Sequence, residues 1–250
     1  MRTMDFPKKM ELNSCSLKID DRFMANVSSR ESLTDIAILE NRIGLLAISI
    51  KNPRFSNEMV TSFLEFSRSG FSEALITIVD KPYERNLLAA KKDSVWLLAE
   101  TEKLRRIANE TKVRINRMIG KVAGVKVRLL DWDELQKNTP DWLIREIREA
   151  WNQRGSFYEH IRAQTASVLL DTSDDQIDGY AEFMLEELPV LLQLYYFSEA
   201  AMADAYPGPQ PDLFWKIESG FFAEQLPVLT GRMKEANGVI YLHWMERSAS

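Results

Sequence analysis

Residues on which many enzymes and secreted domains depend are scarce here: the 250-residue chain has one cysteine, two histidines and ten glycines. A lone cysteine, Cys15, allows no internal disulfide framework, and the opening MRTMDFPKKMEL lacks the apolar stretch of an export signal. We therefore expect a reducing, cytoplasmic location. One cysteine and two distant histidines make no zinc site, so no metal is expected. No apolar run approaches the roughly 20 residues that cross a bilayer, so no membrane span is expected.

Glycine-rich phosphate loops are missing too. The segment 44–48, GLLAI, lacks the second glycine of a dinucleotide-binding turn, and no Walker-type loop occurs, so no nucleotide cofactor is expected. His160 falls in a polar helical segment and His243 in an expected strand. A serine hydrolase with a Ser-His-Asp triad would therefore need the fold to bring one of these histidines to a serine.

Apolar residues, by contrast, make up 45% of the chain and follow the pattern of an α/β protein. Runs rich in β-branched residues predict strands at 44–50, 74–79, 125–130 and 238–244. Helical periodicity predicts helices at 57–68, 86–122, 140–154, 155–170, 174–188 and 211–226. Because helical segments separate strands of nearly continuous apolar character, we expect a mainly parallel sheet flanked by helices.

Local signals set the expected boundaries of these elements. Pro140 and Ser173 are typical helix starts, and the proline-rich segment 205–211 predicts a loop. No linker or repeat divides the chain, so residues 31–250 are expected to form a single domain. Residues 1–30 lack periodicity and are expected to be a loosely attached extension.

Ser49 stands at the end of the first apolar run, in GLLAISIKNPRFS, 44–56. Ligands of open α/β sheets bind beyond the carboxyl ends of the strands, so a serine at this place is a candidate nucleophile. Without a histidine to activate it, the serine needs a substrate that arrives already activated, and help from a carboxylate, a tyrosine or the substrate amine. The alternative interpretation is that Ser49 only ends a strand or caps a turn.

Cations recur along one face of the helical segment 97–122. At about 100° per residue, apolar residues such as Leu104 and Ile115 fall on another side, facing the core. The cationic row consists of Lys103, Arg106, Arg114, Arg117 and Lys121. Although the net charge is −5, regularly spaced cations suit a nucleic-acid backbone, because they release counterions from its phosphates. The alternative is a solvated helix face, and no known nucleic-acid motif accompanies the row.

Four stretches in this order resemble the cyclodipeptide synthases, a family that joins the amino acids of two aminoacyl-tRNAs into a diketopiperazine. The likeness covers roughly 33–245. Its stretches are LLAISIKNPRFS (45–56), ALITIVDKPYERNLLA (74–89), VKVRLLDWDELQKNTPDW (125–142), and FMLEELP (183–189) followed by AYP (205–207). The resemblance implies a single Rossmann-like domain, similar to the catalytic domain of class I aminoacyl-tRNA synthetases without their ATP motifs. It also implies no cofactor, two aminoacyl-tRNAs as partners, and a monomer.

The same resemblance implies a ping-pong reaction and assigns roles by position. Ser49 corresponds to the nucleophile that carries the aminoacyl and then the dipeptidyl group. Glu187 corresponds to the carboxylate that holds the substrate amine, Tyr206 to a proton relay in ring closure, and Asn52 to an anchor of the dipeptidyl intermediate or its loop. The pocket walls correspond to Leu45, Ala47 and Val190 for the first side chain, and to Thr77 and Val79 for the second. These walls are mostly aliphatic and small, which favours apolar amino acids.

Two positions depart from the family pattern. Phe183 stands where the family usually has a tyrosine, and it cannot donate a hydrogen bond to the substrate amine. On a helix, Tyr180 shares a face with Phe183 and Glu187, so we expect its hydroxyl, or a water, to supply the missing group. Pro207 after Tyr206 resembles one branch of the family, whereas Asn52 is more typical of the other.

Each assigned residue also has an ordinary structural interpretation. Glu187 fits an exposed helix carboxylate, Tyr206 a packing residue in a proline-rich loop, and Val79 ordinary core. A second function class therefore stays open: a non-catalytic protein that binds tRNA or another RNA through a synthetase-like fold, for which Phe183 is the main indication.

Overall fold

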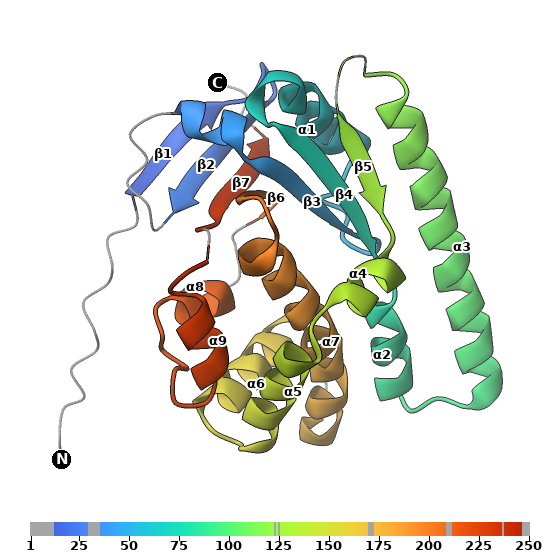
Figure 1. Ribbon diagram of the computed structural model, residues 1–250. Helices are drawn as coiled ribbons and strands as arrows, with labels where there is room; N and C mark the ends of the chain where they lie inside the picture. Colours follow the sequence, from blue (N-terminus) through green and yellow to red (C-terminus); the bar gives the residue numbers. More distant parts are fainter. Residues whose placement is uncertain are drawn as a thin grey trace.

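The structure, a computed structural model, describes residues 13–29, 36–122, 124, 126–169, 173–208, 212–236 and 238–246. The described residues form a seven-stranded sheet in the order β1-β2-β7-β6-β3-β4-β5 (Figure 1). The strands are β1 (Asn13–Lys18), β2 (Phe23–Ser29), β3 (Ile43–Ser49), β4 (Glu73–Val79), β5 (Val127–Leu130), β6 (Met202–Tyr206) and β7 (Ile240–Glu246). The five strands from β7 to β5 run parallel to one another, and β2 is antiparallel both to β7 and to β1. The predicted mainly parallel α/β fold is confirmed.

Helices cover both faces of this sheet. They are a 3₁₀ helix (Ile36–Asn41), α1 (Asn57–Gly70), α2 (Pro82–Ala89), α3 (Ser94–Ile119), α4 (Trp132–Asn138), α5 (Asp141–Asn152), α6 (Ser156–Val168), α7 (Asp174–Phe197), α8 (Asp212–Glu218) and α9 (Pro227–Arg232). Residues of α1 and α3 pack in the core on one face, whereas residues of α5 to α9 pack in the core on the other. Figure 1 shows α5 to α9 gathered below the strands.

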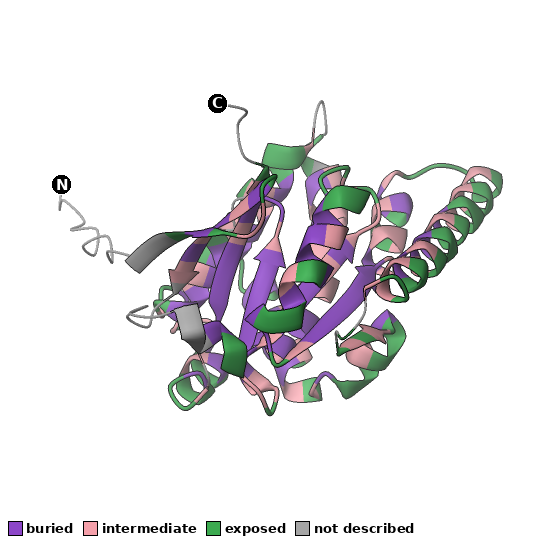
Figure 2. Cartoon of the chain, turned by 90° about the horizontal axis from the view of Figure 1, so that it is seen from above, coloured by how far each residue is buried: buried purple, intermediate pink, exposed green. Residues whose placement is uncertain are grey.

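The alternation of side chains along β3 builds these two cores. Leu45 belongs to the core with α5 to α9, whereas Leu46 and Ile48 belong to the core with α1 and α3. Successive residues of a strand point to opposite faces, so Ala47 and Ser49 lie on the same face as Leu45. The serine at the end of β3 therefore faces the side of α7. Seen from above in Figure 2, the strands are mostly buried and α3 lies at the edge of the molecule.

Helix boundaries follow local capping, as the sequence predicts. Ser173 caps α7 through a capping box with Gln176, and Pro140 is the N-cap residue of α5, so both predicted helix starts are confirmed. Ser56 caps α1, with its hydroxyl accepting from the backbone N–H of Met59 at 3.2 Å. The predicted helix over 86–122 is instead two helices, α2 and α3, because Asp93 is the N-cap residue of α3.

Two segments differ from the sequence prediction. Residues 13–29 form β1 and β2 of the common sheet, not a loose extension; residues 1–12 lie outside the described residues. Along β2 only alternate side chains are buried, and such a strand has no continuous apolar run. The segment 205–211 was expected to be a loop, but β6 extends to Tyr206. This strand is short and holds Asp204, so it has no strong local signal.

Candidate active site

The site lies where the strand order of the sheet reverses. From β3 the chain proceeds to β4 and β5 on one side, and later returns as β6 on the other side of β3. Such a switch point leaves a crevice beyond the carboxyl ends of the two central strands. Ser49 ends β3 and Tyr206 ends β6, so the fold brings together two predicted residues that are more than 150 positions apart.

The loop after β3 holds Asn52 in a defined orientation. Its backbone N–H donates to the carbonyl of Ser49 at 3.1 Å, which closes a tight turn. Its side-chain oxygen accepts from the backbone N–H of Arg54 at 3.0 Å, and its amide nitrogen donates to the hydroxyl of Tyr206 at 3.4 Å. The Tyr206 ring also packs edge-on against Phe55, with centroids 5.8 Å apart. Asn52 thus links the end of β3 to the end of β6.

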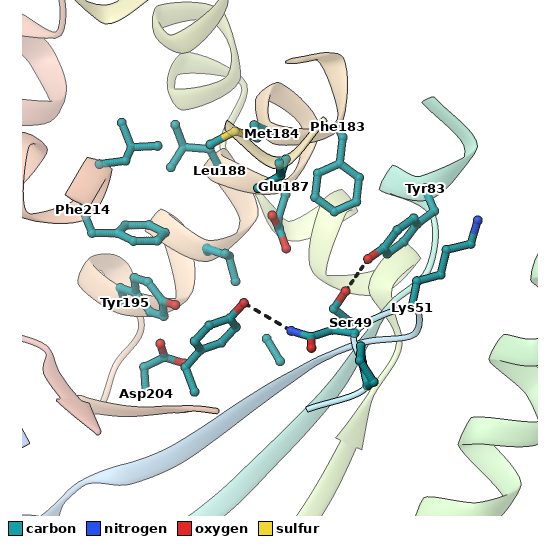
Figure 3. Close-up of a pocket in the computed structure, with 17 residues that line it drawn as sticks. Ser49, Lys51, Tyr83, Phe183, Met184, Glu187, Leu188, Tyr195, Asp204 and Phe214 are labelled. Carbon is teal, nitrogen blue, oxygen red and sulfur yellow. Dashed lines mark hydrogen bonds between the residues drawn. The ribbon is translucent and has the colours of Figure 1, made fainter. Parts of the chain in front are cut away.

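Helix α7 supplies the opposite wall of the crevice. Residues at intervals of about four share a helix face. Phe183, Glu187, Leu191 and Tyr195 recur at this spacing, and all of them line one cavity of about 560 Å³. Ala47, Ser49, Asn52, Tyr83, Asp204 and Tyr206 line the same cavity. Figure 3 shows the carboxylate of Glu187 descending from α7 toward the side chains at the strand ends.

Ser49 has a partner that sequence reasoning missed. Its Oγ lies 2.5 Å from the hydroxyl of Tyr83, and either atom can donate this hydrogen bond. Tyr83 stands in the first turn of α2, and its ring packs edge-on against Phe183 with centroids 4.9 Å apart. Figure 3 shows the three side chains side by side. Tyr83 occurs in one of the stretches that carry the family resemblance, but nothing in the sequence tells which tyrosine the fold brings to the serine.

Burial and like charge raise the pKa values of the polar groups around the cavity. Burial, followed by the charge of Asp204, raises the pKa of Glu187 to about 7. Burial raises the pKa of Tyr83 and of Tyr206, and the charge of Glu187 raises both further. Burial and the nearby Asp204 raise the pKa of Tyr195 well above its usual range. The carboxyl groups of Glu187 and Asp204 therefore interact electrostatically, and both line the same cavity. The sequence had indicated Glu187 but not Asp204.

The remaining predicted pocket residues lie away from this cavity wall. Leu45 and Val190 are buried in the core, Thr77 is fully buried with its hydroxyl donating to the carbonyl of Leu130 at 3.4 Å, and Val79 packs with Trp132. Pro207 lines a separate hollow with His243. Tyr180 is half-buried on α7 and does not line the cavity either. Of the predicted walls, Ala47 alone reaches the cavity; a role of the others in binding substrate stays a prediction.

The cationic row runs along α3 and just past its end, as predicted, but its members differ in exposure and in their contacts. Lys103, Arg106, Arg117 and Lys121 are exposed, and Lys103 pairs with Glu100 at 3.2 Å. Arg114 is half-buried and lines a hollow together with Ser49, Lys51 and Asn57. Its Nε is buried without a hydrogen-bond partner among the described residues. The middle of the row thus adjoins the loop that follows the candidate nucleophile.

Neither histidine lines the cavity of Ser49, and both belong to the described part of the chain. His160 on α6 contacts the Lys216 ammonium at 3.1 Å, and His243 on β7 lines the hollow with Pro207. A Ser-His-Asp triad is therefore absent from the described residues. Among these residues there is also no group of three or more His, Cys, Asp or Glu that could hold a metal. No described helix is long and apolar enough to cross a bilayer.

Several solved structures that are similar to this fold are cyclodipeptide synthases. One from Staphylococcus haemolyticus superimposes with a TM-score of 0.68 at 16% identity, covering 90% of this chain and all of that one, 100%. One from Candidatus Glomeribacter gigasporarum, bound to Phe-tRNAPhe, gives 0.60 at 16% identity over 89% and 95% of the two chains. A Mycobacterium tuberculosis protein, described as relating cyclodipeptide synthetases to type I tRNA synthetases, gives 0.62 at 13% identity over 97% and 99%.

No protein-family model matches the chain, and no curated protein matches its sequence. The likeness therefore lies in the fold: the chain has the α/β architecture of the cyclodipeptide synthases, which is related to that of class I aminoacyl-tRNA synthetases. Recognition of this resemblance from four short stretches is confirmed at that level. The identities with these structures are only 12–19%, so the likeness is one of fold and not of overall sequence.

Proposed function

We propose that the protein is a cyclodipeptide synthase, an aminoacyltransferase that makes a cyclic dipeptide from two aminoacyl-tRNAs. The main support is one observation: the Ser49 hydroxyl faces a cavity that is also lined by Glu187, Tyr206 and Asn52. This set occurs at the switch point of a fold that solved cyclodipeptide synthases share. A serine without histidine suits an activated acyl donor, and the ester of an aminoacyl-tRNA is one.

The proposed reaction has three steps: acylation of Ser49, formation of a peptide bond on the enzyme, and ring closure that releases Ser49. In the first, Oγ bonds to the carbonyl carbon of an aminoacyl-tRNA, the ester bond breaks, and the serine proton leaves with the ribose oxygen. The amine of this aminoacyl-enzyme then attacks a second aminoacyl-tRNA, which gives a dipeptidyl-enzyme and a second free tRNA. Finally the new amine attacks the ester at Ser49, the ring closes, and Oγ regains a proton. Each step exchanges an activated ester for an ester or an amide, so no ATP is required.

Glu187 and Tyr206 have positions that suit these proton movements. A carboxylate with a pKa of about 7 can hold the substrate ammonium and accept a proton near neutral pH. The Tyr206 hydroxyl is fixed by Asn52 and lines the same cavity, where it can pass a proton between amine and ester oxygen. A volume of about 560 Å³ is that of an ordinary small-ligand pocket and has room for an aminoacyl or dipeptidyl group.

The tRNA body would lie along α3. One structure with this fold contains Phe-tRNAPhe, and we infer the same class of substrate here. The cationic row of α3 also supports a tRNA substrate. Arg114 lines a hollow together with Ser49, and the other cations of the row lie along the same helix and just past its end. The second candidate is a non-catalytic tRNA-binding protein, favoured by the missing hydroxyl at Phe183. The Tyr83 hydroxyl contacts Ser49, and this phenol beside the serine favours an enzyme over a non-catalytic tRNA-binding protein.

Expression in bacteria, with mass spectrometry of the medium, tests the proposal. The wild-type protein is expected to release cyclic dipeptides, and Ser49→Ala is expected to release none while remaining folded by circular dichroism. The masses of the cyclic dipeptides would also identify the amino acids that the enzyme joins. Release by Ser49→Ala at the wild-type level would contradict the nucleophile. Absence of cyclic dipeptides with the wild type, together with retained tRNA binding, would favour the non-catalytic alternative.

A further inference from the structure

The Tyr83 hydroxyl has a place in the site that the roles proposed so far do not explain. It lies 2.5 Å from Ser49 Oγ, within hydrogen-bonding distance of the proposed nucleophile. Tyr83 lines the cavity next to Ser49 and Phe183. The contact therefore involves the atom that forms and breaks bonds in the proposed reaction.

Three features hold the Tyr83 ring in this position. Pro82 begins α2, and the backbone N–H of Tyr83 donates to the carbonyl of Asp80 at 3.1 Å, so the first turn of the helix is fixed just after β4. The ring packs against Phe183 on one side. The Lys51 ammonium lies 5.6 Å from the ring centroid, over its face. A phenol held on three sides loses little freedom when it makes a catalytic hydrogen bond.

The Tyr83 phenol is protonated at neutral pH and can therefore act as a hydrogen-bond donor. Burial and the charge of Glu187 raise the pKa of Tyr83, so the hydroxyl keeps its proton at neutral pH and cannot act as a base. A protonated phenol that faces Oγ gives its best hydrogen bond when Oγ carries negative charge. The serine oxygen carries such charge in two steps, when it attacks an ester and when it leaves during ring closure.

We propose that Tyr83 is a catalytic residue, whose hydroxyl donates a hydrogen bond to Ser49 Oγ while negative charge develops on that oxygen. This inference rests on the proposed function and deepens it. In the acylation step, the Oγ–carbon bond forms as the ester bond to the ribose breaks; in ring closure, the Oγ–carbon bond breaks as the amide forms. Tyr83 keeps its own proton in both steps and lowers the energy of the alkoxide-like oxygen.

This role of Tyr83 is distinct from that of the hydroxyl missing at Phe183, because that hydroxyl would contact the substrate amine and not Ser49 Oγ. Tyr180 or a water was expected to supply that hydroxyl; Tyr180 does not line the cavity, and its role stays a prediction. The Tyr83 ring packs directly on Phe183. Phe183 then has a structural role, because its ring supports the ring of Tyr83 from α7. The phenol reaches the serine from α2, a different element from the one that carries Glu187.

The test compares Tyr83→Phe with wild type and with Tyr158→Phe, which removes a phenol hydroxyl on α6 that contacts Asp178. Total bacterial tRNA charged with a labelled amino-acid mixture is the probe, and the label bound to protein is followed at short times. Tyr83→Phe keeps the ring and its packing, so we expect a fold and thermal midpoint close to wild type. We expect its acylation rate constant to fall about 100-fold, with KM changed little, because one charge-stabilising donor is lost.

The outcomes separate this inference from the proposed function. Slow acylation in Tyr83→Phe, with wild-type rates in Tyr158→Phe, would support Tyr83 as the donor. Equal acylation rates in wild type and Tyr83→Phe would overturn the role of Tyr83 while leaving a serine-dependent synthase in place. A lower acylation rate in Tyr180→Phe, with a wild-type rate in Tyr83→Phe, would also overturn it. If wild type and its variants all fail to acquire label, the proposed function itself is wrong.

Discussion

The cavity of Ser49 and the cationic row of α3 would contact the same substrate, but they are built in opposite ways. The cavity takes residues from β3 and the loop after it, β6, α2 and α7, and hydrogen bonds of 2.5 and 3.4 Å join Ser49 to Tyr83 and Asn52 to Tyr206. The row is one continuous segment at the edge of the molecule, with most of its cations exposed (Figure 2). Charges in a secluded cavity interact strongly, whereas exposed charges are screened by water and salt.

This difference teaches where single substitutions matter. In the proposed reaction each polar group of the cavity has its own role, so the loss of one atom should change the rate. On α3 the proposed attraction to tRNA is shared among several cations, so a single charge should contribute only a small part of the affinity. Arg114 stands between the two regions, since it is half-buried and lines a hollow with Ser49. Four sets of variants test this contrast, from the largest expected effect to the smallest.

Glu187→Gln should show the largest effect and move activity and stability in opposite directions. We expect cyclic dipeptide formation to fall about 100-fold, because an amide neither accepts a proton nor pairs with an ammonium. Glu187 has a folded pKa of about 7 against an ordinary 4.5, so the folded state holds a proton that the unfolded chain has lost. Its ionisation therefore lowers stability as pH rises through that window, and Glu187→Gln should gain about 1–3 kcal/mol at pH 8.

Chemical denaturation of both proteins at pH 8 and pH 5, beside product assays, checks this prediction. At pH 5 the stability difference should shrink, since the carboxyl is then protonated in the folded state. A variant that is less stable than wild type at pH 8 would show that the carboxylate is stabilised in the free protein.

Arg114→Glu combined with Arg117→Glu should come next. We expect tRNA affinity at low salt to fall about 10-fold or more, and the slope of log affinity against log salt to become shallower by about one to two units, since two phosphate contacts are lost. Filter binding with charged bacterial tRNA measures both quantities. The matched control is Arg145→Glu with Lys234→Glu, two exposed cations on and near α5 and α9, which makes the same change in net charge. Equal losses in both double variants would mean that net charge, not the row, governs binding.

Asp204→Asn should have a smaller and more specific effect. Removal of a like charge favours ionised Glu187, so the pKa of Glu187 should fall toward its ordinary value. The acid limb of kcat/KM should therefore move about one unit to lower pH. A pH profile measured with charged bacterial tRNA checks the direction. A limb that stays at the same pH would show that burial alone sets the pKa of Glu187.

Lys103→Glu should have the smallest effect among these variants. Lys103 already pairs with Glu100, and along a helix it lies about 16 Å from Arg114, at about 1.5 Å per residue. We expect tRNA affinity to change about 2-fold, less than for a single Arg114→Glu variant. Filter binding beside that single variant decides the order. A larger loss for Lys103→Glu would extend the functional part of the row to this end of α3.

Much of the scaffold follows from local sequence. The runs at 44–50 and 74–79 become β3 and β4, and Ser173 begins α7 as its capping pattern predicts. β2 was missed because its buried side chains alternate with less buried ones, and β6 because it is short and includes Asp204. β2 pairs with β7, and β6 pairs with β3, so both strands depend on partners that are distant in the sequence.

What the sequence determined by itself is a mainly parallel sheet, a serine at the end of a buried strand and cations along one helix, because these depend on local periodicity. Only the tertiary structure decided which groups meet that serine. The crossing of the chain at the switch point brings Tyr206 and Asp204 to the cavity of Ser49, and the packing of α2 on α7 brings Tyr83. Contacts between distant segments depend on strand order and helix packing, which no local pattern records.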